Sequence, residues 1–343
     1  MSDQPTYTIA DVARLAGVSV STVSRILNGK HDVAPATRDR VQQIIAEIGF
    51  KPHAQAQRLR AGKTRNLALL FPLKSPGNIP YNPLEVDFIL GAAAAAAEKD
   101  FLFSLITTPV TKQSLLNLYR SAQIDGLVLM QVYAHDWRAD LLRNNNCPFV
   151  MIGRCDDNTG LNFIDIDFES AVQTAFDHLV GLGHRKIAFL GQPAEMRKHG
   201  WGPATHAWQG YERALATHSL APLYRETGSQ RREIIDSTLE LLDEQPDLTA
   251  IVSVHEFAPL SVIQALKKRG RNVPDDCSLI AIMNERIGEL SSPPMTHVDF
   301  PAHAMGYEAV QMLIRRLEGD PASPEHIMIP PRLIIRNSTA PLG

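Results

Sequence analysis

The chain has 343 residues, with 34 Lys and Arg against 37 Asp and Glu, a formal net charge of −3, and 44% hydrophobic residues. This length accommodates more than one hydrophobic core. No apolar run approaches the roughly 20 residues that a membrane-spanning helix needs, and the N-terminus lacks the basic and apolar pattern of a signal peptide. Both observations argue against a membrane or secreted protein. The odd number and wide spacing of Cys147, Cys155 and Cys277 argue against a disulfide framework or a zinc site, so we expect a cytoplasmic protein without metal or cofactor.

The charge is unevenly distributed along the chain. Residues 1–65 contain 10 Lys and Arg against 5 Asp and Glu, which leaves 24 against 32 for the remainder. A net charge of +5 over so short a segment attracts phosphates, whereas the acidic remainder is repelled from a duplex. Charge alone also fits an ordinary solvated surface, so the interpretation as a nucleic-acid end depends on the elements that this segment contains.

Two short helices joined by a tight turn are predicted between Thr8 and Asn28. Thr8 can cap the first helix, with Asp11 three residues later, and Ser19 can cap the second. The apolar residues that can close inward at helical spacing are Ile9, Val12, Ala13, Val18, Val23, Ile26 and Leu27. This pattern predicts a helix-turn-helix.

The outward face of the second helix carries hydroxyl groups, an amide and one arginine, which suits a DNA groove. In helix-turn-helix proteins the second helix enters the major groove by its N-terminal end, which here places Val20, Ser21 and Arg25 nearest the base edges. With the flanking turn positions included, the predicted DNA-contacting residues of this segment are Thr8, Ser19, Val20, Ser21, Thr22, Ser24, Arg25, Asn28 and His31.

A third helix and a linker follow. The helix is predicted over 36–48, after Pro35 at a starting position and before Gly49. Residues 51–63 are basic and helix-compatible, with Leu59 as the one large apolar residue. Because so short a helix is marginal in water, we expect it to order only against a partner.

From residue 66 onward, short apolar runs alternate with helical patterns. Strands are predicted in a first series at 67–73, 101–107, 126–131 and 149–152, and in a second series at 163–167, 186–190, 250–254 and 278–283. Helices are predicted between them at 83–99, 113–122, 169–182, 204–219, 232–244 and 258–269. This alternation requires parallel sheets with helices on both faces, so two series imply two doubly wound lobes with a ligand cleft between them.

Polar and aromatic residues follow several of the predicted strand ends. The candidate effector contacts are Tyr81, Asn82, Arg154, Trp201, His206, Trp208, His255, Glu256 and Asn284. Aromatic rings stack on the C–H faces of sugars, and arginine, amide and carboxylate groups hydrogen-bond their hydroxyls, so the set fits a small carbohydrate. The alternatives are a core position for Trp208 and a surface position for His206 and His255.

Six sequence blocks occur in order along the chain. They are DVARLAGVSVSTVSRILNGK, EIGFKPHAQAQRLRAGKTRNLALLFP, DGLVL, HLVGLGHRKIAFLG, GYERAL and PPRLIIRNST. Together they closely resemble the lactose-repressor family of bacterial transcription regulators, over essentially the whole chain. A helix-turn-helix alone would be a weaker signal than these blocks in this order.

The resemblance implies an α/β protein with a small all-α headpiece and a two-lobed body similar to periplasmic sugar-binding proteins. It implies a DNA-binding domain at 1–50, a hinge helix and linker at 51–65, and an effector-binding and dimerisation domain at 66–343. The lobe limits it implies are 66–162 with 298–325 for lobe 1, and 163–297 with 326–343 for lobe 2. Hinge helices of the family insert a leucine into the minor groove of the operator, and Leu59 stands at that position, so the resemblance implies DNA contacts for Arg58 and Leu59. The alternative for Leu59 is a packing residue of an ordinary linker.

Several positions depart from the family pattern. Many members have an arginine that holds sugar hydroxyls where this chain has Ala207, and an Asn-Asp pair where it has His255 and Glu256. An Asp-Asp pair of the family is Asn284 and Glu285 here. We therefore expect an atypical ligand. The missing arginine argues against an effector held there by a phosphate or carboxylate, although Arg154 and Arg197 could supply the positive charge from elsewhere.

No enzymatic motif is complete in the sequence. His255 and Glu256 would begin a zinc-binding HExxH pair, but Pro259 stands where the second histidine is needed. We therefore expect no enzyme. The resemblance implies instead a homodimeric repressor of carbohydrate uptake or catabolism genes, bound to a near-palindromic operator in double-stranded DNA and controlled by a small sugar-like effector between the lobes. The tail after Arg336 lacks leucine heptads, which favours a dimer over a tetramer.

Two aspects of this function stay open at the level of sequence. The effector is an inducer if the free dimer pairs the hinge helices and a corepressor if the liganded dimer does so, and sugar-responsive members of the family favour induction. The alternative functions are a soluble sugar-binding receptor without a DNA function and a corepressor-dependent regulator of non-sugar metabolism.

Overall fold

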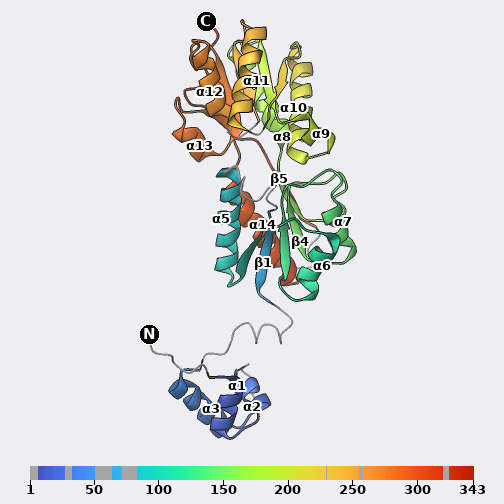
Figure 1. Cartoon of the computed structure of the whole chain (residues 1–343), viewed down its shortest axis with the longest axis vertical. Coiled ribbons are helices and arrows are strands. Elements are labelled where there is room, and N and C mark those ends of the chain that lie inside the picture. Colours follow the sequence, from blue (N-terminus) through green and yellow to red (C-terminus); the bar gives the residue numbers. More distant parts are fainter. Residues whose placement is uncertain are drawn as a thin grey trace. The chain divides into compact units, whose positions relative to one another are not determined.

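The computed structural model describes residues 7–27, 33–50, 64–71, 83–228, 230–254, 258–319 and 324–343. The chain divides into two compact units, Met1–Thr64 and Arg65–Gly343 (Figure 1). Across the described ranges, none of the helices combines the length and the apolar character that a membrane span requires.

The described residues of the smaller unit form three helices, α1 (Ile9–Ala16), α2 (Val20–Leu27) and α3 (Pro35–Ile48). Thr8 and Asp11 form a reciprocal capping box at the start of α1, in which each side chain accepts a hydrogen bond from the other residue's amide. The core that the three helices share consists of Val12, Ala13, Ala16, Val23, Ile26, Val41 and Phe50. The helix-turn-helix, the cap of its first helix and the third helix are thus confirmed.

The larger unit has two lobes, and the first is built on a parallel sheet of six strands in the order β11-β5-β4-β3-β1-β2. The strands are β1 (Asn66–Leu70), β2 (Leu102–Ile106), β3 (Gly126–Leu129), β4 (Phe149–Ile152), β5 (Phe163–Ile166) and β11 (His326–Ile329). The helices are α5 (Pro83–Glu98), α6 (Lys112–Arg120), α7 (Trp137–Asn144) and α14 (Ala302–Leu317). Helices α5 and α14 cover one face of the sheet, and α6 and α7 cover the other.

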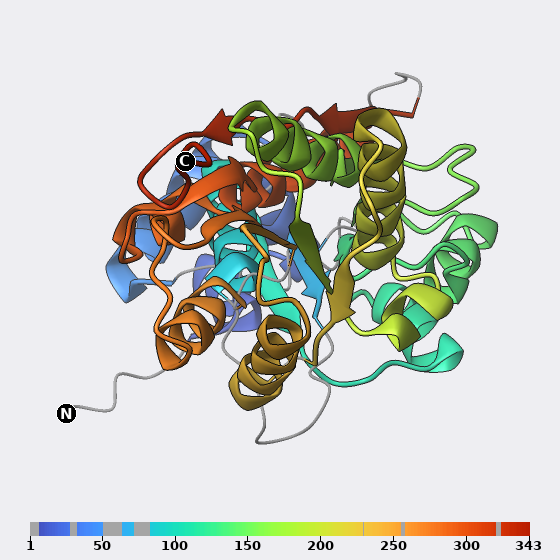
Figure 2. The same ribbon diagram turned by 90° about the horizontal axis from the view of Figure 1, so that it is seen from above.

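The second lobe has a six-stranded sheet in the order β12-β10-β9-β8-β6-β7, parallel except for β12. The strands are β6 (Ile187–Gly191), β7 (Tyr224–Glu226), β8 (Ala250–Ser253), β9 (Ser278–Met283), β10 (Thr296–Asp299) and β12 (Leu333–Ile334). The helices are α8 (Phe168–Gly181), α9 (Ala194–Lys198), α10 (Gly202–His218), α11 (Arg231–Glu244), α12 (Ala258–Lys268) and α13 (Glu285–Leu290). Figure 2 shows α8 and α10 on one side of the sheet and α11 and α12 on the other, which confirms two doubly wound lobes.

The lobe limits that were expected from the sequence are wrong at three strands. Strands β5 and β11 belong to the first sheet, and β10 belongs to the second. The four buried residues of β5 would suit either sheet, but β5 pairs with β4, with Phe163 opposite Met151, and this pairing places it in the first sheet. Within the described residues the chain therefore crosses between the lobes at 167, at 300–301 and at 330–332.

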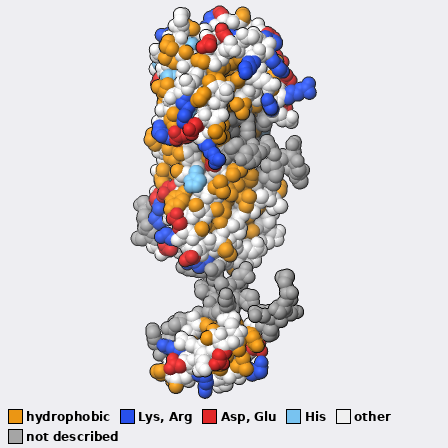
Figure 3. Space-filling model, turned by 90° about the vertical axis from the view of Figure 1, so that its left-hand side faces the viewer, with side chains coloured by type: hydrophobic (Ala, Val, Ile, Leu, Met, Phe, Trp, Pro, Cys, Tyr) orange, Lys and Arg blue, Asp and Glu red, His pale blue; other side chains and the backbone are white. Residues whose placement is uncertain are grey.

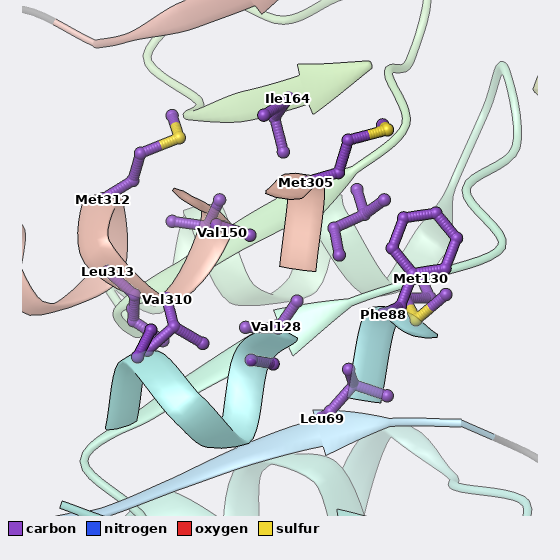
Figure 4. Packing of buried hydrophobic residues seen from close by; sticks show 14 of the residues in the cluster. Leu69, Phe88, Val128, Met130, Val150, Ile164, Met305, Val310, Met312 and Leu313 are labelled. Carbon is purple, nitrogen blue, oxygen red and sulfur yellow. The ribbon is translucent and has the colours of Figure 1, made fainter. Parts of the chain in front are cut away.

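Helices α5 and α14 of the first lobe cross at two glycines. A Cβ atom on Gly91 would lie 2.0 Å from the backbone oxygen of His303, and one on Gly306 would lie 2.1 Å from that of Phe88. The close crossing lets α14 turn Met305, Val310 and Leu313 toward the sheet (Figure 4). The run of small residues that begins at Gly91 thus permits two backbones to touch, which larger side chains would forbid.

Candidate functional site

The N-terminal end of α2 presents short polar side chains. The Ser19 hydroxyl accepts a hydrogen bond of 3.1 Å from the Thr22 amide, which caps α2 as predicted, and it lies 2.7 Å from the Ser21 hydroxyl. Val20 is 39% exposed, and Ser21 and Arg25 are also exposed. Val23 and Ile26 face the core, so the polar side of α2 is held outward by the packing of its apolar side.

The other predicted DNA contacts divide into two groups. Thr22 and Ser24 are half-buried on α2, and Thr8 is exposed, with its hydroxyl donated to the Asp11 carboxylate at 2.7 Å. The hydrogen bonds from Thr8 lower the pKa of Asp11, which keeps the acceptor of the capping box ionised. Asn28, His31, Arg58 and Leu59 lie outside the described residues.

A cavity of about 100 Å³ lies between the two lobes of the larger unit. This is far more than the roughly 10–15 Å³ that one water needs, so the cavity is not a packing defect. Its polar and charged lining residues are Glu85, Gln131, Arg154, Asp165 and Gln192. Its apolar walls include Leu84, Phe88, Met130, Val132, Ile152, Phe168, Trp201, Val254, Ile282, Phe300 and Met305.

Backbone hydrogen bonds join the lobes at one side of this cavity. Ala134 donates its amide to the Gly200 carbonyl at 2.7 Å, and Gly202 donates to the Val132 carbonyl at 3.2 Å. These bonds flank a β-bridge between Tyr133 and Trp201, whose indole lines the cavity. Gly200 has a φ of +74°, a conformation that favours glycine, so the approach of the two loops depends on this residue.

The charged groups of the cavity are engaged with one another. Arg154 donates from Nη1 to the Asp165 carboxylate at 2.7 Å, and Asp165 also accepts the amide of Ile166 at 2.9 Å. Gln131 donates from Nε2 to the Glu85 carboxylate at 3.2 Å. Burial raises the pKa of Asp165 to about 6, because desolvation outweighs the attraction of the Arg154 guanidinium.

The amide of Gln192 is only half satisfied. Its Nε2 donates to the Val254 carbonyl at 3.4 Å, whereas its Oε1 is buried and has no hydrogen-bond partner among the described residues. The side chain is 9% exposed and lines the cavity. A buried acceptor without a partner is uncommon in folded proteins, so this oxygen is a place where a ligand can donate.

The structure brings two of the predicted effector residues, Arg154 and Trp201, to the cavity. Trp208 belongs instead to the second-lobe core: it packs against Phe189 and Tyr211 and donates from Nε1 to Glu212 at 2.8 Å. Trp208 is therefore a packing residue outside the described cavity lining, which is the alternative that its helical spacing allowed. Tyr81, Asn82, His255 and Glu256 lie outside the described residues.

His206 and Asn284 also lie away from the cavity lining. His206 contacts the Gln209 side chain at 3.0 Å, and burial lowers its pKa. Asn284 caps α13 by accepting the amide of Ile287, and it donates across the lobes to Asp87 of α5. These contacts make Asn284 a bridge between the lobes in this structure.

Sequence reasoning missed Asp165, Gln192 and the aromatic wall. Asp165 stands within β5 and not after its end, and Phe300 lies on a crossing segment that no strand pattern marked. Gln192 follows β6 directly, so the rule that ligands gather at strand ends could have found it.

Metal ligation and disulfides have no support in the described part of the chain. No group of three or more His, Cys, Asp or Glu side chains could hold a metal ion there. Cys147, Cys155 and Cys277 are free thiols, and burial raises the pKa of Cys155 to about 11.

Figure 3 shows acidic and basic side chains mixed over the visible face of the larger unit, with hydrophobic ones between them.

Asp165→Asn is expected to change how stability depends on pH. Between pH 3.8 and about 6 the folded chain holds a proton on Asp165 that the unfolded chain has released, so the wild type loses stability as the pH rises through this window. The variant lacks that titration. Urea unfolding at several pH values should show the wild type losing stability relative to the variant, whereas a relative gain would mean that pairing with Arg154 outweighs burial.

Comparison with known proteins gives two family matches and relatives that cover nearly the whole chain. Residues 8–53 match the bacterial regulatory proteins of the lacI family, and residues 176–339 match the periplasmic binding protein-like domain. Catabolite control protein A of Priestia megaterium is 30% identical over 341 residues, which cover 97% of this chain and 99% of that protein.

Two solved structures are similar over nearly their full length. The transcriptional regulator CelR-cellobiose complex is 27% identical with a TM-score of 0.71, and it covers 97% of this chain and 99% of its own. The Lac repressor dimer bound to operator and the anti-inducer ONPF is 22% identical with a TM-score of 0.82, and it covers 98% of this chain and 100% of its own. The second likeness shows a shared fold.

Proposed function

Because the chain belongs to the lacI family of bacterial regulatory proteins, we propose that it represses genes of carbohydrate uptake or catabolism in response to a small sugar-like effector between its lobes. Family membership makes it a DNA-binding transcription regulator and not an enzyme.

The observation that carries the proposal is the inter-lobe cavity. It combines aromatic and aliphatic walls with a small number of polar groups, which is the usual composition of a small-molecule site. Segments that join the lobes border it, so a ligand there contacts both lobes and the crossing residue Phe300 at once. A relative of similar length, CelR, is solved in complex with cellobiose, which supports a sugar as the ligand class.

The proposed mechanism couples this cavity to the headpiece through a dimer. Two copies of α2 read the half-sites of a near-palindromic operator, about one helical turn apart. The effector stabilises one angle between the lobes, and that angle sets whether the hinge segments at 51–65 can pair. In the version that we favour, the free dimer pairs the hinges and the effector acts as an inducer.

Leu59→Ala tests the hinge part of the mechanism. An apolar wedge in the minor groove unstacks a base step and bends the duplex, at a cost of a few kcal/mol that the added contacts offset. We expect the variant to fold normally but to lose both operator bending and affinity, as measured by circular-permutation mobility shifts. Unchanged bending would show that Leu59 is an ordinary linker residue.

A mobility-shift assay tests the proposal as a whole. The DNA is the region upstream of the protein's own gene, and the assay is run with the full chain, with and without cellobiose, maltose and ribose. We expect a specific complex that one neutral sugar weakens. A soluble sugar receptor would give no complex with any DNA, and a corepressor-dependent regulator would give a complex that its ligand strengthens.

A further inference from the structure

Among the residues that the structure describes, the charges that line the inter-lobe cavity do not favour an anion. One cation, Arg154, and two carboxylates, Glu85 and Asp165, are the charged residues of its described lining. Asp165 holds Arg154 at 2.7 Å, so the guanidinium is already neutralised at short range. A phosphate or carboxylate that entered would therefore meet a net negative lining and would have to displace a buried carboxylate from its partner.

Arg197, the other arginine that could supply a positive charge, does not change this balance. Arg197 donates to the Glu226 carboxylate at 2.8 Å, and its guanidinium stacks at 3.9 Å over the ring of Trp208, outside the cavity lining. The guanidinium of Arg197 is thus already engaged by Glu226 and Trp208 of the second lobe. Ala207, which stands where many family members have an arginine, is 1% exposed and packs in that same core.

The polar feature of the cavity that still needs a partner is an acceptor. Gln192 Oε1 is buried without a partner among the described residues, while Nε2 of the same amide is fixed on the Val254 carbonyl, which settles the orientation of the amide. A ligand that fits must therefore bring a donor, such as a hydroxyl. A ligand that brings only acceptors would leave this oxygen unsatisfied.

The apolar side of the cavity suits the C–H face of a ring. Phe300, on the crossing between the lobes, meets Phe88 of the first lobe at 5.8 Å and Phe168 of the second at 5.6 Å between ring centroids, both edge to face. All three rings line the cavity. A flat, weakly polar ligand face can lie on this wall, which a strongly hydrated charged group cannot do without losing its water.

We propose that the cavity takes an uncharged polyhydroxy ligand, which donates a hydroxyl to Gln192 Oε1 and rests an apolar face on the phenylalanine wall, and that it rejects phosphorylated and carboxylated sugars. This inference rests on the proposed function in that the same cavity is taken as the effector site. It goes further by assigning selectivity to Gln192 and to the closed pair of Arg154 and Asp165.

Calorimetry on the full chain without DNA tests the charge selectivity. The probes are matched pairs: ribose with ribose 5-phosphate, glucose with glucose 6-phosphate, and cellobiose with cellobionate. We expect at least one neutral sugar to bind and its anionic partner to bind at least about tenfold more weakly, which corresponds to 1.4 kcal/mol. An anion that binds as tightly as its parent, or binding by none of the neutral sugars at millimolar concentration, overturns the proposal.

Gln192→Leu tests the acceptor. It keeps the approximate volume of the side chain but removes Oε1, so affinity for the neutral sugar should fall roughly five- to tenfold. Gln113→Leu is the matched control, because Gln113 is exposed on α6 and does not line the cavity. Equal affinity of wild type and Gln192→Leu overturns the role of Gln192.

The two proposals fail in distinguishable ways. Absence of a specific complex in the mobility-shift assay defeats the proposed repressor but leaves the calorimetric selectivity standing. A phosphorylated sugar that binds tightly and releases operator DNA overturns the uncharged ligand but leaves the repressor standing.

Discussion

Gly91→Ala is expected to lower the free energy of unfolding of the larger unit by about 3 kcal/mol or more, the upper range for overpacking a core. The new methyl group would lie 2.0 Å from the backbone oxygen of His303, so it can be accommodated only if α5 and α14 move apart. That movement would open the contact of both helices with the first sheet. Urea unfolding followed by tryptophan fluorescence measures the effect, because Trp137, Trp201 and Trp208 all lie in this unit.

Gly181→Ala is the matched control for this substitution. Gly181 also lies in a helix, but a Cβ there would meet nothing within 4 Å, and its φ is not in the left-handed region. Alanine should therefore raise stability by about 0.4–1 kcal/mol, because it restricts the unfolded chain. If Gly91→Ala were as stable as the wild type, the close crossing of α5 and α14 described above would be incorrect.

Arg25→Ala is expected to cost about 1–3 kcal/mol in operator binding, which is roughly a 5- to 150-fold loss of affinity. Arg25 is exposed in the last turn of α2, whereas Val20 and Ser21, the other predicted base contacts on this helix, are small. We therefore expect the guanidinium to supply much of the direct hydrogen bonding to a base, with arginine to guanine as the commonest pairing. Binding to a set of operator variants should show relaxed preference at one base pair.

Arg232→Ala is the control for the DNA experiments. Arg232 is an exposed arginine at the start of α11, and its ion pair with Asp236 is long, at 3.7 Å. Its removal changes the net charge by the same amount as Arg25→Ala and should leave operator affinity unchanged. Equal weakening of Arg25→Ala on unrelated DNA would identify Arg25 as a phosphate contact, and no weakening at all would remove it from the interface.

Local signals in the sequence were enough for the smaller unit. The Thr8 and Asp11 pair, the Ser19 cap and the glycine after α3 act within a few residues, so their physical effect is visible in the chain itself. The parallel sheets could also be predicted, because buried strands and amphipathic helices alternate along the larger unit. Strand pairing could not, since the apolar pattern of β5 fits either sheet and only its alignment with β4 and β11 decides.

The candidate effector site was predictable only in part. Arg154 and Trp201 follow the rule that ligand residues stand just after strand ends or on the loops there. Asp165 and Phe300 reach the cavity because of how the crossing segments run, which is a property of the assembled lobes. Trp208 is the opposite case: it follows a strand in sequence, as a ligand residue would, but its position on α10 packs it against the second-lobe core.

Family likeness fixes the fold more firmly than it fixes the ligand. Gln192, which the family resemblance did not single out, lines the cavity, whereas Ala207, at which the chain departs from the family pattern, packs in the second-lobe core. Asn284 also differs from the family pattern, and its side chain caps α13 and hydrogen-bonds Asp87 of the facing lobe. The effector class therefore has to be argued from this cavity and not transferred from a relative.

Reciprocal linkage between operator and effector tests the central claim most directly. Operator affinity of the full chain is measured with and without a saturating neutral sugar that binds in calorimetry, and sugar affinity is measured with and without saturating operator. The account predicts that both affinities change by the same factor, about 5- to 150-fold, because coupling between two sites is reciprocal. Operator affinity that is the same with and without the bound sugar would contradict it.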